Sequence, residues 1–445
     1  MNETPSSPAP ELNLNLPALV ESWPSLAPTA RKETFNSLAR PDAEELFLNL
    51  SPKDQYELYS EMPVPQHRSW LRLLAPDDAA DLIQEMPHDD REGELALLDE
   101  ATKREVGALL AYEEDAAGGL MNSRFVRLRP DTSVDVAIRY LRAQAKTPIE
   151  TVQFAYVLNS AQKLLGAVSF RDLLLAPYDK TVAEIMESDL VTLPETMDQE
   201  QVSRFFSQHD LTAIPVVDGE GRMVGVVTVD DIVDVVEEEA TEDMQKVGGM
   251  EALDAPYLQV RLREMIKKRA GWLMILFFSE MFTATAMGYY EHEISRAVVL
   301  ALFIPLIISS GGNSGSQATT LVIRAMALGE VRLQDWWRVL YREICSGLAL
   351  GAILGSIGLM RILLWPTRLT LYGIHYRLIA ATVALSLVGI VLWGTLAGSM
   401  LPFVLRRLGF DPASASAPFV ATLVDVTGIV IYFTVASHIL AGTIL

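Results

Sequence analysis

The stretch FVATLVDVTGIVIYF, from Phe419 to Phe433, is almost entirely apolar and carries one carboxylate, Asp425. A segment with this composition is typical of a membrane-spanning helix. A charged Asp at the centre of such a helix costs roughly 2.5 to 3.5 kcal/mol on insertion scales, so acids at this depth usually serve a function. Asp425 is therefore the first candidate functional residue.

The chain of 445 residues has two parts of opposite character. Residues 1–260 have a net charge of −27, whereas residues 261–445 have a net charge of +6 and are mostly apolar. Such an acidic front part repels nucleic acid and attracts cations, so it excludes a DNA- or RNA-binding role. The one cysteine, Cys345, excludes an internal disulfide framework.

Five apolar runs in the second part are each long enough to cross a lipid bilayer. They are Ala270–Tyr289, Ala297–Met326, Ile344–Trp365, Leu378–Val404 and Ala417–Leu445. Eleven Lys and Arg residues flank these runs on the side of the acidic part, against four on the other side. This bias predicts a multi-pass membrane protein with cytoplasmic N-terminal domains and an external C-terminus.

The second run contains a polar, glycine-rich segment, GGNSGSQ, from Gly311 to Gln317. Its glycines have two interpretations: close packing of helices through small residues, or a loosened helix whose free carbonyls line a wet cavity. Asn313 and Gln317 lie four residues apart and share one helical face, so their amide oxygens are candidates to line a pore.

Asp425 also has two interpretations. It is either a protonated acid that hydrogen-bonds between helices or a carboxylate that binds a cation on a conduction path. Glu280 in the first run is a second intramembrane acid, with pairing and proton transfer as its alternative roles. The candidate ligands are all hard oxygens, which favours Mg²⁺, Ca²⁺ or Mn²⁺. A largely hydrated Mg²⁺ suits one Asp per chain best, above all if a two-fold axis brings two copies together.

In the acidic part we expect a disordered tail over residues 1–40 and a stack of short acidic helices over residues 41–122. A repeat follows: LLGAVSFRDLL (Leu164–Leu174) aligns with MVGVVTVDDIV (Met223–Val233) at an offset of 59 residues. Each copy predicts a strand, a glycine turn, a second strand and a helix. The repeat resembles a tandem pair of CBS domains, over residues 123–181 and 182–240, and that family often binds ATP or another adenine nucleotide.

We expect a connecting (plug) helix over residues 241–269. A run of carboxylates stands just before it and in its first turn: Glu237, Glu238, Glu239, Glu242 and Asp243. Like charges at this spacing disfavour an isolated helix. Either solvent and the basic stretch Arg261–Arg269 offset the repulsion, or divalent cations bridge this helix to neighbouring acidic domains.

These features together resemble the MgtE family of magnesium transporters. The likeness rests on YEEDAAGGLM, the tandem CBS modules, EEEATEDMQKVGGMEAL, GGNSGSQATTLVIRA and PFVATLVDVTGIVIYF. It implies three parts: an α-helical superhelical N domain, α/β CBS domains and an all-α pore domain of five transmembrane helices over residues 270–445. It further implies a homodimeric Mg²⁺ channel of the inner membrane that is not an enzyme.

The resemblance also implies roles for single residues. Asp425 is the pore acid that holds hydrated Mg²⁺, with the Ala421 carbonyl and Asn313 nearby. Asp411 joins the connector carboxylates Glu239, Glu242 and Asp243 in regulatory Mg²⁺ sites.

The implied mechanism is a feedback gate. Cytoplasmic Mg²⁺ draws the acidic domains together and shuts the pore. Two other functions remain open from the residues: an ion-coupled exporter of divalent cations, and a CBS-based sensor that conducts nothing.

Overall fold

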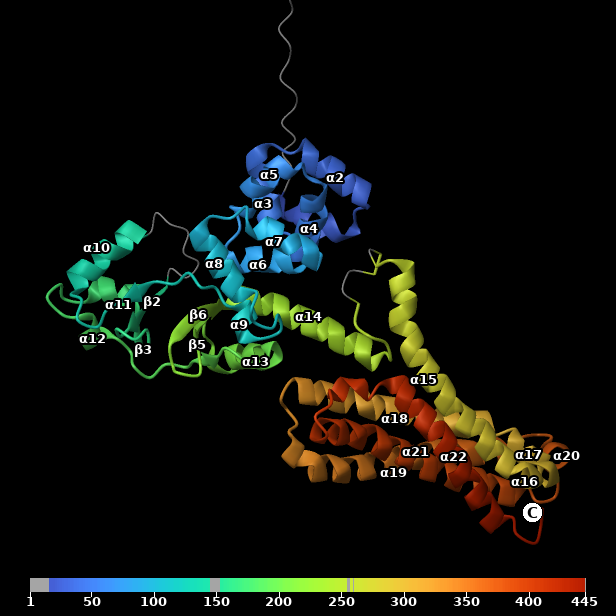
Figure 1. The fold of residues 1–445 in the computed structure, drawn as a ribbon. Helices are drawn as coiled ribbons and strands as arrows, with labels where there is room; N and C mark the ends of the chain where they lie inside the picture. The colour runs from blue at the N-terminus through green and yellow to red at the C-terminus, as the bar shows by residue number, and fades with distance from the viewer. Residues whose placement is uncertain (1–15, 145–152, 254–256, 259, 445) are drawn as a thin grey trace, which may run out of the picture. The chain divides into compact units, whose positions relative to one another are not determined.

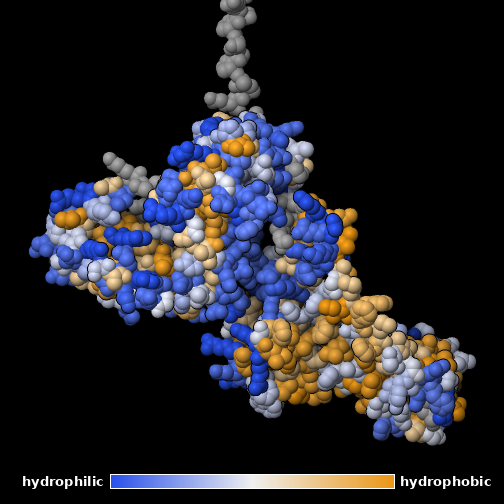
Figure 2. Space-filling model, in the orientation of Figure 1, coloured by the Kyte–Doolittle hydropathy of each residue, from blue (hydrophilic) through white to orange (hydrophobic). Residues whose placement is uncertain are grey.

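The computed structural model describes residues 16–144, 153–253, 257–258 and 260–444. The chain divides into two compact units, Met1–Glu239 and Ala240–Leu445, and Figure 1 shows the elements of each. The first unit contains helices and two small sheets, whereas the second is entirely helical in its described residues. Figure 2 shows the same division in hydropathy: the surface of the first unit is mostly hydrophilic and that of the second mostly hydrophobic.

The first unit begins with a stack of short helices, as the sequence predicts. They are α1 (Leu16–Ser22), the 3-10 helix η1 (Trp23–Ser25), α2 (Pro28–Ser37), α3 (Arg40–Leu48), α4 (Pro52–Glu61), α5 (Val64–Leu71), α6 (Pro76–Gln84), α7 (His88–Leu95), α8 (Glu100–Leu109) and α9 (Ala117–Leu120). A proline stands in the first turn of each helix from α2 to α6, where its missing N–H is not needed.

The prediction of a disordered tail over residues 1–40 is wrong for residues 16–40. Residues 1–15 lie outside the described residues, but residues 16–40 form α1, η1, α2 and the start of α3. Trp23 is only 1% exposed and belongs to the same hydrophobic core as Phe47 and Trp70. Burial of this indole fixes the segment, a contact that the polar composition of the N-terminus does not reveal.

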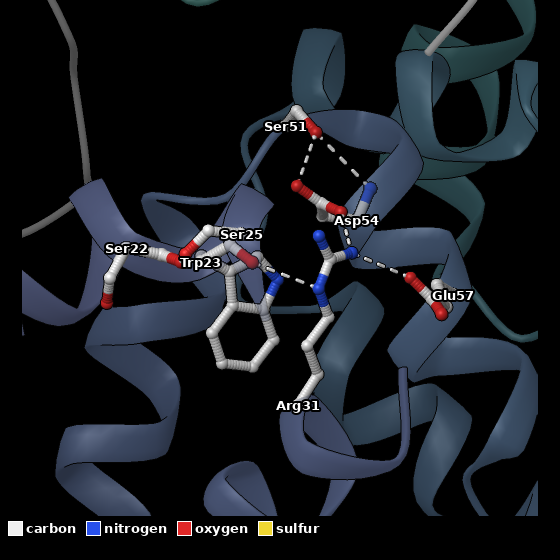
Figure 3. A network of polar contacts seen from close by, with 7 residues as sticks. All are labelled: Ser22, Trp23, Ser25, Arg31, Ser51, Asp54 and Glu57. Carbon is white, nitrogen blue, oxygen red and sulfur yellow. Dashed lines mark hydrogen bonds and ion pairs between the residues drawn. The ribbon is translucent and has the colours of Figure 1, made fainter. Parts of the chain in front are cut away.

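A buried arginine ties these first helices together (Figure 3). Arg31 is 2% exposed, and its Nε donates to the Trp23 carbonyl at 3.0 Å. Its Nη1 forms ion pairs with Asp54 at 2.6 Å and with Glu57 at 2.9 Å. Asp54 is also buried and accepts from Ser51. The charges of α2 and α4 therefore neutralise one another inside the domain.

We expect Arg31→Met to lower the free energy of unfolding of this domain by about 3 to 5 kcal/mol, because it leaves the buried Asp54 carboxylate without its cation. Lys32→Met is the matched control, since Lys32 pairs with Glu61 at a surface site where both side chains are about half exposed. An exposed pair is worth at most about 1 kcal/mol. Thermal unfolding of the two variants compares the loss of the buried ion pair with the loss of the exposed one. Equal midpoints would contradict the role given to Arg31.

Two similar modules follow, each with a three-stranded sheet. The first contains β1 (Arg127–Leu128), α10 (Val134–Gln144), β2 (Phe154–Leu158), β3 (Leu164–Ser169), α11 (Phe170–Leu175) and α12 (Val182–Ile185). The second contains β4 (Leu193–Pro194), α13 (Gln199–His209), β5 (Ala213–Val217), β6 (Met223–Thr228) and α14 (Val229–Val247). The sheets have the orders β1-β2-β3 and β4-β5-β6, each with one parallel and one antiparallel pair.

The two modules are related by a local pseudo-two-fold axis. Lys163 and Arg222 occupy equivalent positions, 59 residues apart, and they face each other in an antiparallel bridge. The prediction of a glycine turn in each module is wrong, because Gly166 lies inside β3 and Gly225 inside β6. A Cβ on Gly166 would lie 2.5 Å from the Glu187 carbonyl oxygen, so glycine allows another segment to approach the strand closely.

The second unit contains five helices that are long and apolar enough to cross a membrane, which confirms the predicted number. These candidate spans are Leu262–Tyr289, Val298–Ala327, Leu333–Leu363, Tyr376–Arg407 and Ala417–Ile439. Their helices are α15 (Leu262–Tyr289), α17 (Val298–Ala301) with α18 (Ile304–Ala327), η2 (Leu333–Asp335) with α19 (Trp336–Leu363), α21 (Tyr376–Arg407) and α22 (Ala417–Ile439). Shorter elements between them are α16 (Glu291–Arg296), α20 (Arg368–Tyr372) and η3 (Pro412–Ser414). The basic stretch Arg261–Arg269 belongs mainly to α15 rather than to a separate connecting helix.

The glycine-rich segment of α18 packs closely against its neighbours. A Cβ on Gly315 would lie 2.8 Å from Val420 of α22 and 3.0 Å from the Gly394 carbonyl oxygen of α21. One on Gly398 of α21 would collide with the Gly315 carbonyl oxygen. The helix is continuous through this segment. The packing interpretation of these glycines is therefore confirmed, and no loosened turn is present in α18.

Candidate functional site

Asp425 lies in the middle of α22, half-buried, and faces the glycine segment of α18. A Cβ built on Gly312 would lie 3.8 Å from Oδ1 of Asp425 and 3.4 Å from Cβ of Ala421. Ala421 stands one turn before Asp425 on the same helix. The missing side chain at Gly312 therefore leaves the carboxylate and Ala421 next to the α18 backbone. This arrangement brings together two of the predicted site residues.

Asn313 follows Gly312 directly, and its side chain is exposed, as is that of Gln317 one turn later. Four residues separate them, so the two amides share one face of α18. The buried face of the same helix carries Gly311 and Gly315. Asn313 thus borders the Asp425 site from the outward side of the bundle and presents amide groups at membrane depth.

A lysine near the end of α14 forms an ion pair with a residue just before the last span. Asp411 stands at the N-terminus of η3, just before α22, and its Oδ2 lies 2.8 Å from Nζ of Lys246 in α14. Nζ of Lys246 also lies 2.5 Å from Oε1 of Glu242. Burial alone would lower the pKa of Lys246, but its hydrogen bonds to Asp411 and Glu242 outweigh burial and raise it. The ammonium therefore stays charged.

Sequence reasoning missed Lys246, although one signal was available. It is the only basic residue between Thr228 and Val260, and it stands four residues after Glu242, the spacing of a helical ion pair. Asp411 and Glu242, two predicted regulatory residues, are thus brought together through Lys246. Of the others, Glu239 accepts from Gln199 at 2.7 Å, and Asp243 lies on α14.

The connection between α14 and the membrane helices contains a second contact that the sequence did not indicate. Gly249 has a φ of +75°, and a Cβ on it would lie 2.8 Å from the indole nitrogen of Trp272 and 3.1 Å from Pro418. The indole N–H of Trp272 donates to Ser416 at 3.1 Å, and Ser416 caps α22. The end of the acidic helix therefore packs on the first turn of the helix that carries Asp425.

In the first unit, carboxylates of the helical domain and the second module face each other. Burial, followed by the charges of Asp78, Glu114, Asp231 and Glu85, raises the pKa of Asp81 to about 7. Burial also raises the pKa of Asp231 to about 6, with Asp230 and Asp78 adding to the effect and Thr228 opposing it. These acids of α6 and of the start of α14 therefore repel one another.

No ready-made metal cluster accompanies these carboxylates. In the part of the chain that the structure describes, no group of three or more His, Cys, Asp or Glu side chains is positioned to hold a metal ion. A cation between α6 and α14 would need the carboxylates to move together.

A bundle of five apolar helices joined by an acidic helix to a paired α/β module defines a multi-pass membrane protein with a large hydrophilic domain. The sequence profile of the MgtE family, described as a divalent cation transporter, matches residues 304–435. The profile of the MgtE intracellular N domain matches residues 14–115, and that of the CBS domain matches residues 117–179 and 182–238.

Three curated relatives are each named magnesium transporter MgtE. The Thermus thermophilus protein is 42% identical over 77% of this chain and 74% of its own length. The Enterococcus faecalis protein is 33% identical over 75% and 71%, and the Bacillus subtilis protein is 31% identical over 77% and 74%. The chain belongs to the MgtE family.

Among solved structures, the cytosolic domain of the Mg²⁺ channel MgtE in complex with ATP is 38% identical to this chain. It covers 50% of this chain and 91% of its own, with a TM-score of 0.47.

Proposed function

We propose that this protein carries Mg²⁺ across a membrane along a path that passes Asp425. The observation that carries the proposal is the position of this carboxylate, half-buried in an apolar helix and facing the side-chain-free backbone of Gly312. A packing residue at this depth would not need a charge. The names of the three curated relatives support magnesium as the substrate.

The chemistry of the side chains favours a hydrated divalent ion. Asp425 supplies a carboxylate and Asn313 an amide, which are hard oxygen ligands that suit Mg²⁺ better than soft metals. Mg²⁺ releases its waters reluctantly and is commonly held by one or two carboxylates through the waters that remain. A hydrated ion held by Asp425 in this way would meet the carboxylate through its waters.

The exposed amides of α18 support assembly as a homodimer, and we place this homodimer in the inner membrane. Asn313 and Gln317 are exposed on a helix in the apolar unit, and polar side chains that face lipid are unfavourable. A second copy across a two-fold axis would cover this face and place two Asp425 sites on either side of a shared path.

Regulation by Mg²⁺ on the side of the N-terminal unit follows from its charge. The carboxylates of α6 and α14 repel one another, so divalent cations favour the arrangement in which these surfaces meet. The ligand shifts the equilibrium through its higher affinity for that arrangement. The contact of Gly249 with Trp272 and Pro418 gives the connecting helix a direct path to the start of α22.

The CBS pair is also proposed to bind an adenine nucleotide. Support comes from the pseudo-symmetric pairing of the two modules at Lys163 and Arg222, the arrangement expected of a CBS pair. Isothermal titration of the full-length protein with ATP tests this, and an absence of binding would contradict it.

The transport proposal is tested by Mg²⁺ uptake into proteoliposomes that contain the full-length protein, with the membrane potential as the driving force. We expect uptake at low Mg²⁺ on the side of the N-terminal unit and little uptake at high Mg²⁺. An uptake that requires a proton or Na⁺ gradient would instead indicate an ion-coupled exporter. A protein that carries no Mg²⁺ under any of these conditions would support the sensor function.

Lys246→Gln tests the regulatory contact. The substitution removes the ammonium from Asp411 and Glu242, so a divalent cation no longer competes with it for these carboxylates. We expect half-inhibition of uptake at a roughly tenfold lower Mg²⁺ concentration, because a resident positive charge has been removed from the site. Lys267→Gln is the matched control, since Lys267 is exposed on α15. If Lys246→Gln needs the same or a higher Mg²⁺ concentration for half-inhibition of uptake, Lys246 does not compete with the cation for these carboxylates.

A further inference from the structure

Glu280 lies on α15 within the first membrane span, and its side chain is exposed on the surface of a single chain. Helix α15 packs against α22, the helix of Asp425. Glu280 and Asp425 are therefore carried by two helices in direct contact. Two acids of one chain, 145 positions apart in sequence, thus lie on adjacent helices of the membrane unit.

No cation within the described residues neutralises Glu280. It forms no ion pair with Lys, Arg or His there, although the first turns of the same span carry several basic residues. An unpaired acid at membrane depth usually faces a water-filled cavity or a bound ion. A structural ion pair therefore does not explain Glu280.

A buried hydroxyl group beside Glu280 points to a ligand independently. Thr283 follows Glu280 by three residues and shares its face of α15. It is 8% exposed, and its Oγ1 has no hydrogen-bond partner among the residues that the structure describes. A threonine in a helix normally donates to a carbonyl of the preceding turn, as Thr285 does to Met281. A buried polar atom without a partner is unfavourable unless water or a ligand satisfies it.

We propose that Glu280 is a second carboxylate of the cation path and that, together with Asp425, it determines the preference for divalent over monovalent ions. This inference rests on the proposed function. One hydrated Mg²⁺ between the two groups would have its double charge balanced by two carboxylates of the same chain, and its waters would hydrogen-bond to both. Such a water would also satisfy the Thr283 hydroxyl, which has no partner among the described residues. Glu280 is thus a specificity-determining residue.

The test compares Glu280→Gln, Asp425→Asn and the control Glu291→Gln in full-length protein. Glu291 lies on α16, outside the five candidate spans. Uptake of Mg²⁺ and of K⁺ into proteoliposomes is measured for each, together with equilibrium binding of Mn²⁺ by electron paramagnetic resonance. For Glu280→Gln we expect a loss of at least about tenfold in the Mg²⁺ to K⁺ uptake ratio and weaker Mn²⁺ binding, because one of two charges facing a divalent ion is removed. Glu291→Gln is expected to match the unmodified protein.

The outcomes separate this inference from the function on which it rests. If Asp425→Asn stops uptake while Glu280→Gln keeps the ratio and the Mn²⁺ affinity of the unmodified protein, the role of Glu280 is wrong and Mg²⁺ transport stands. If the unmodified protein carries no Mg²⁺, the proposed function itself is wrong. Should Glu280→Gln not fold, Glu280→Ala replaces it. That variant also removes the charge, and an unchanged ratio there would also overturn the role.

Discussion

Asp425→Asn is expected to reduce Mg²⁺ uptake by more than about a hundredfold. The amide keeps the size of the side chain but removes the charge that faces the cation, and an interaction with a divalent ion in a low-dielectric surrounding is worth several kcal/mol. Asp425 lies against Gly312, so the substitution should leave the packing of α18 on α22 unchanged. Uptake of Mg²⁺ into proteoliposomes under a fixed membrane potential gives the measurement.

Asp425→Glu is the matched control for this experiment. It retains the charge and adds one methylene beside the Gly312 backbone. We expect measurable uptake with altered ion preference. If Asp425→Asn transports Mg²⁺ at the rate of the unmodified protein, Asp425 has only a packing role and the path lies elsewhere.

Asp81→Asn is expected to lower the Mg²⁺ concentration at which uptake is inhibited. The pKa of Asp81 is raised to about 7 in the folded protein, chiefly by burial. An acid with a raised pKa contributes stability that is fully present below its unfolded pKa, near 4, and is lost as the pH rises through 7. In the absence of divalent cations, the packing of the helical domain on the second module should therefore weaken between pH 4 and pH 7.

The amide of Asp81→Asn does not ionise, so this variant does not lose stability as the pH rises from 4 to 7. We expect hydrogen exchange of α6 that no longer depends on pH in this window, and half-inhibition of uptake at a roughly tenfold lower Mg²⁺ concentration. Asp89→Asn on α7 is the control, because it removes the same charge from an exposed position. A higher Mg²⁺ requirement in Asp81→Asn would show that Asp81 acts as a direct ligand instead of a source of repulsion.

Hydropathy and charge predicted the division of the chain and the five spans because both signals are local. A run of some twenty apolar residues is long enough to cross a bilayer whatever lies around it. The paired modules were predicted for a related reason: the same pattern occurs twice, and Val157 pairs with Gly166 as Val216 pairs with Gly225. The role of these glycines was not predictable, because the close approach at Gly166 comes from a segment about twenty residues away.

The contacts that join distant parts of the chain were missed for a physical reason. Lys246 and Asp411 are 165 positions apart, and helical periodicity gives no information about which loops meet. The proximity of Glu280 to Asp425 depends on the packing of α15 against α22, which two uniformly apolar helices do not specify in sequence. The helices over residues 16–40 were missed because Trp23 and Phe35 are buried against later helices, which the local composition does not reveal.

The glycine contacts of α18 restrict how the membrane helices can move. At Gly315, Gly394 and Gly398 the backbones of α18 and α21 touch, with no layer of side chains between them that could be compressed or rearranged. The Thr319 hydroxyl reinforces this contact by donating to the Gly398 carbonyl at 2.9 Å. The two helices must therefore tilt or slide as one stiff block. Any widening of a passage has to occur along the outward face of that block, where Asn313 and Gln317 lie.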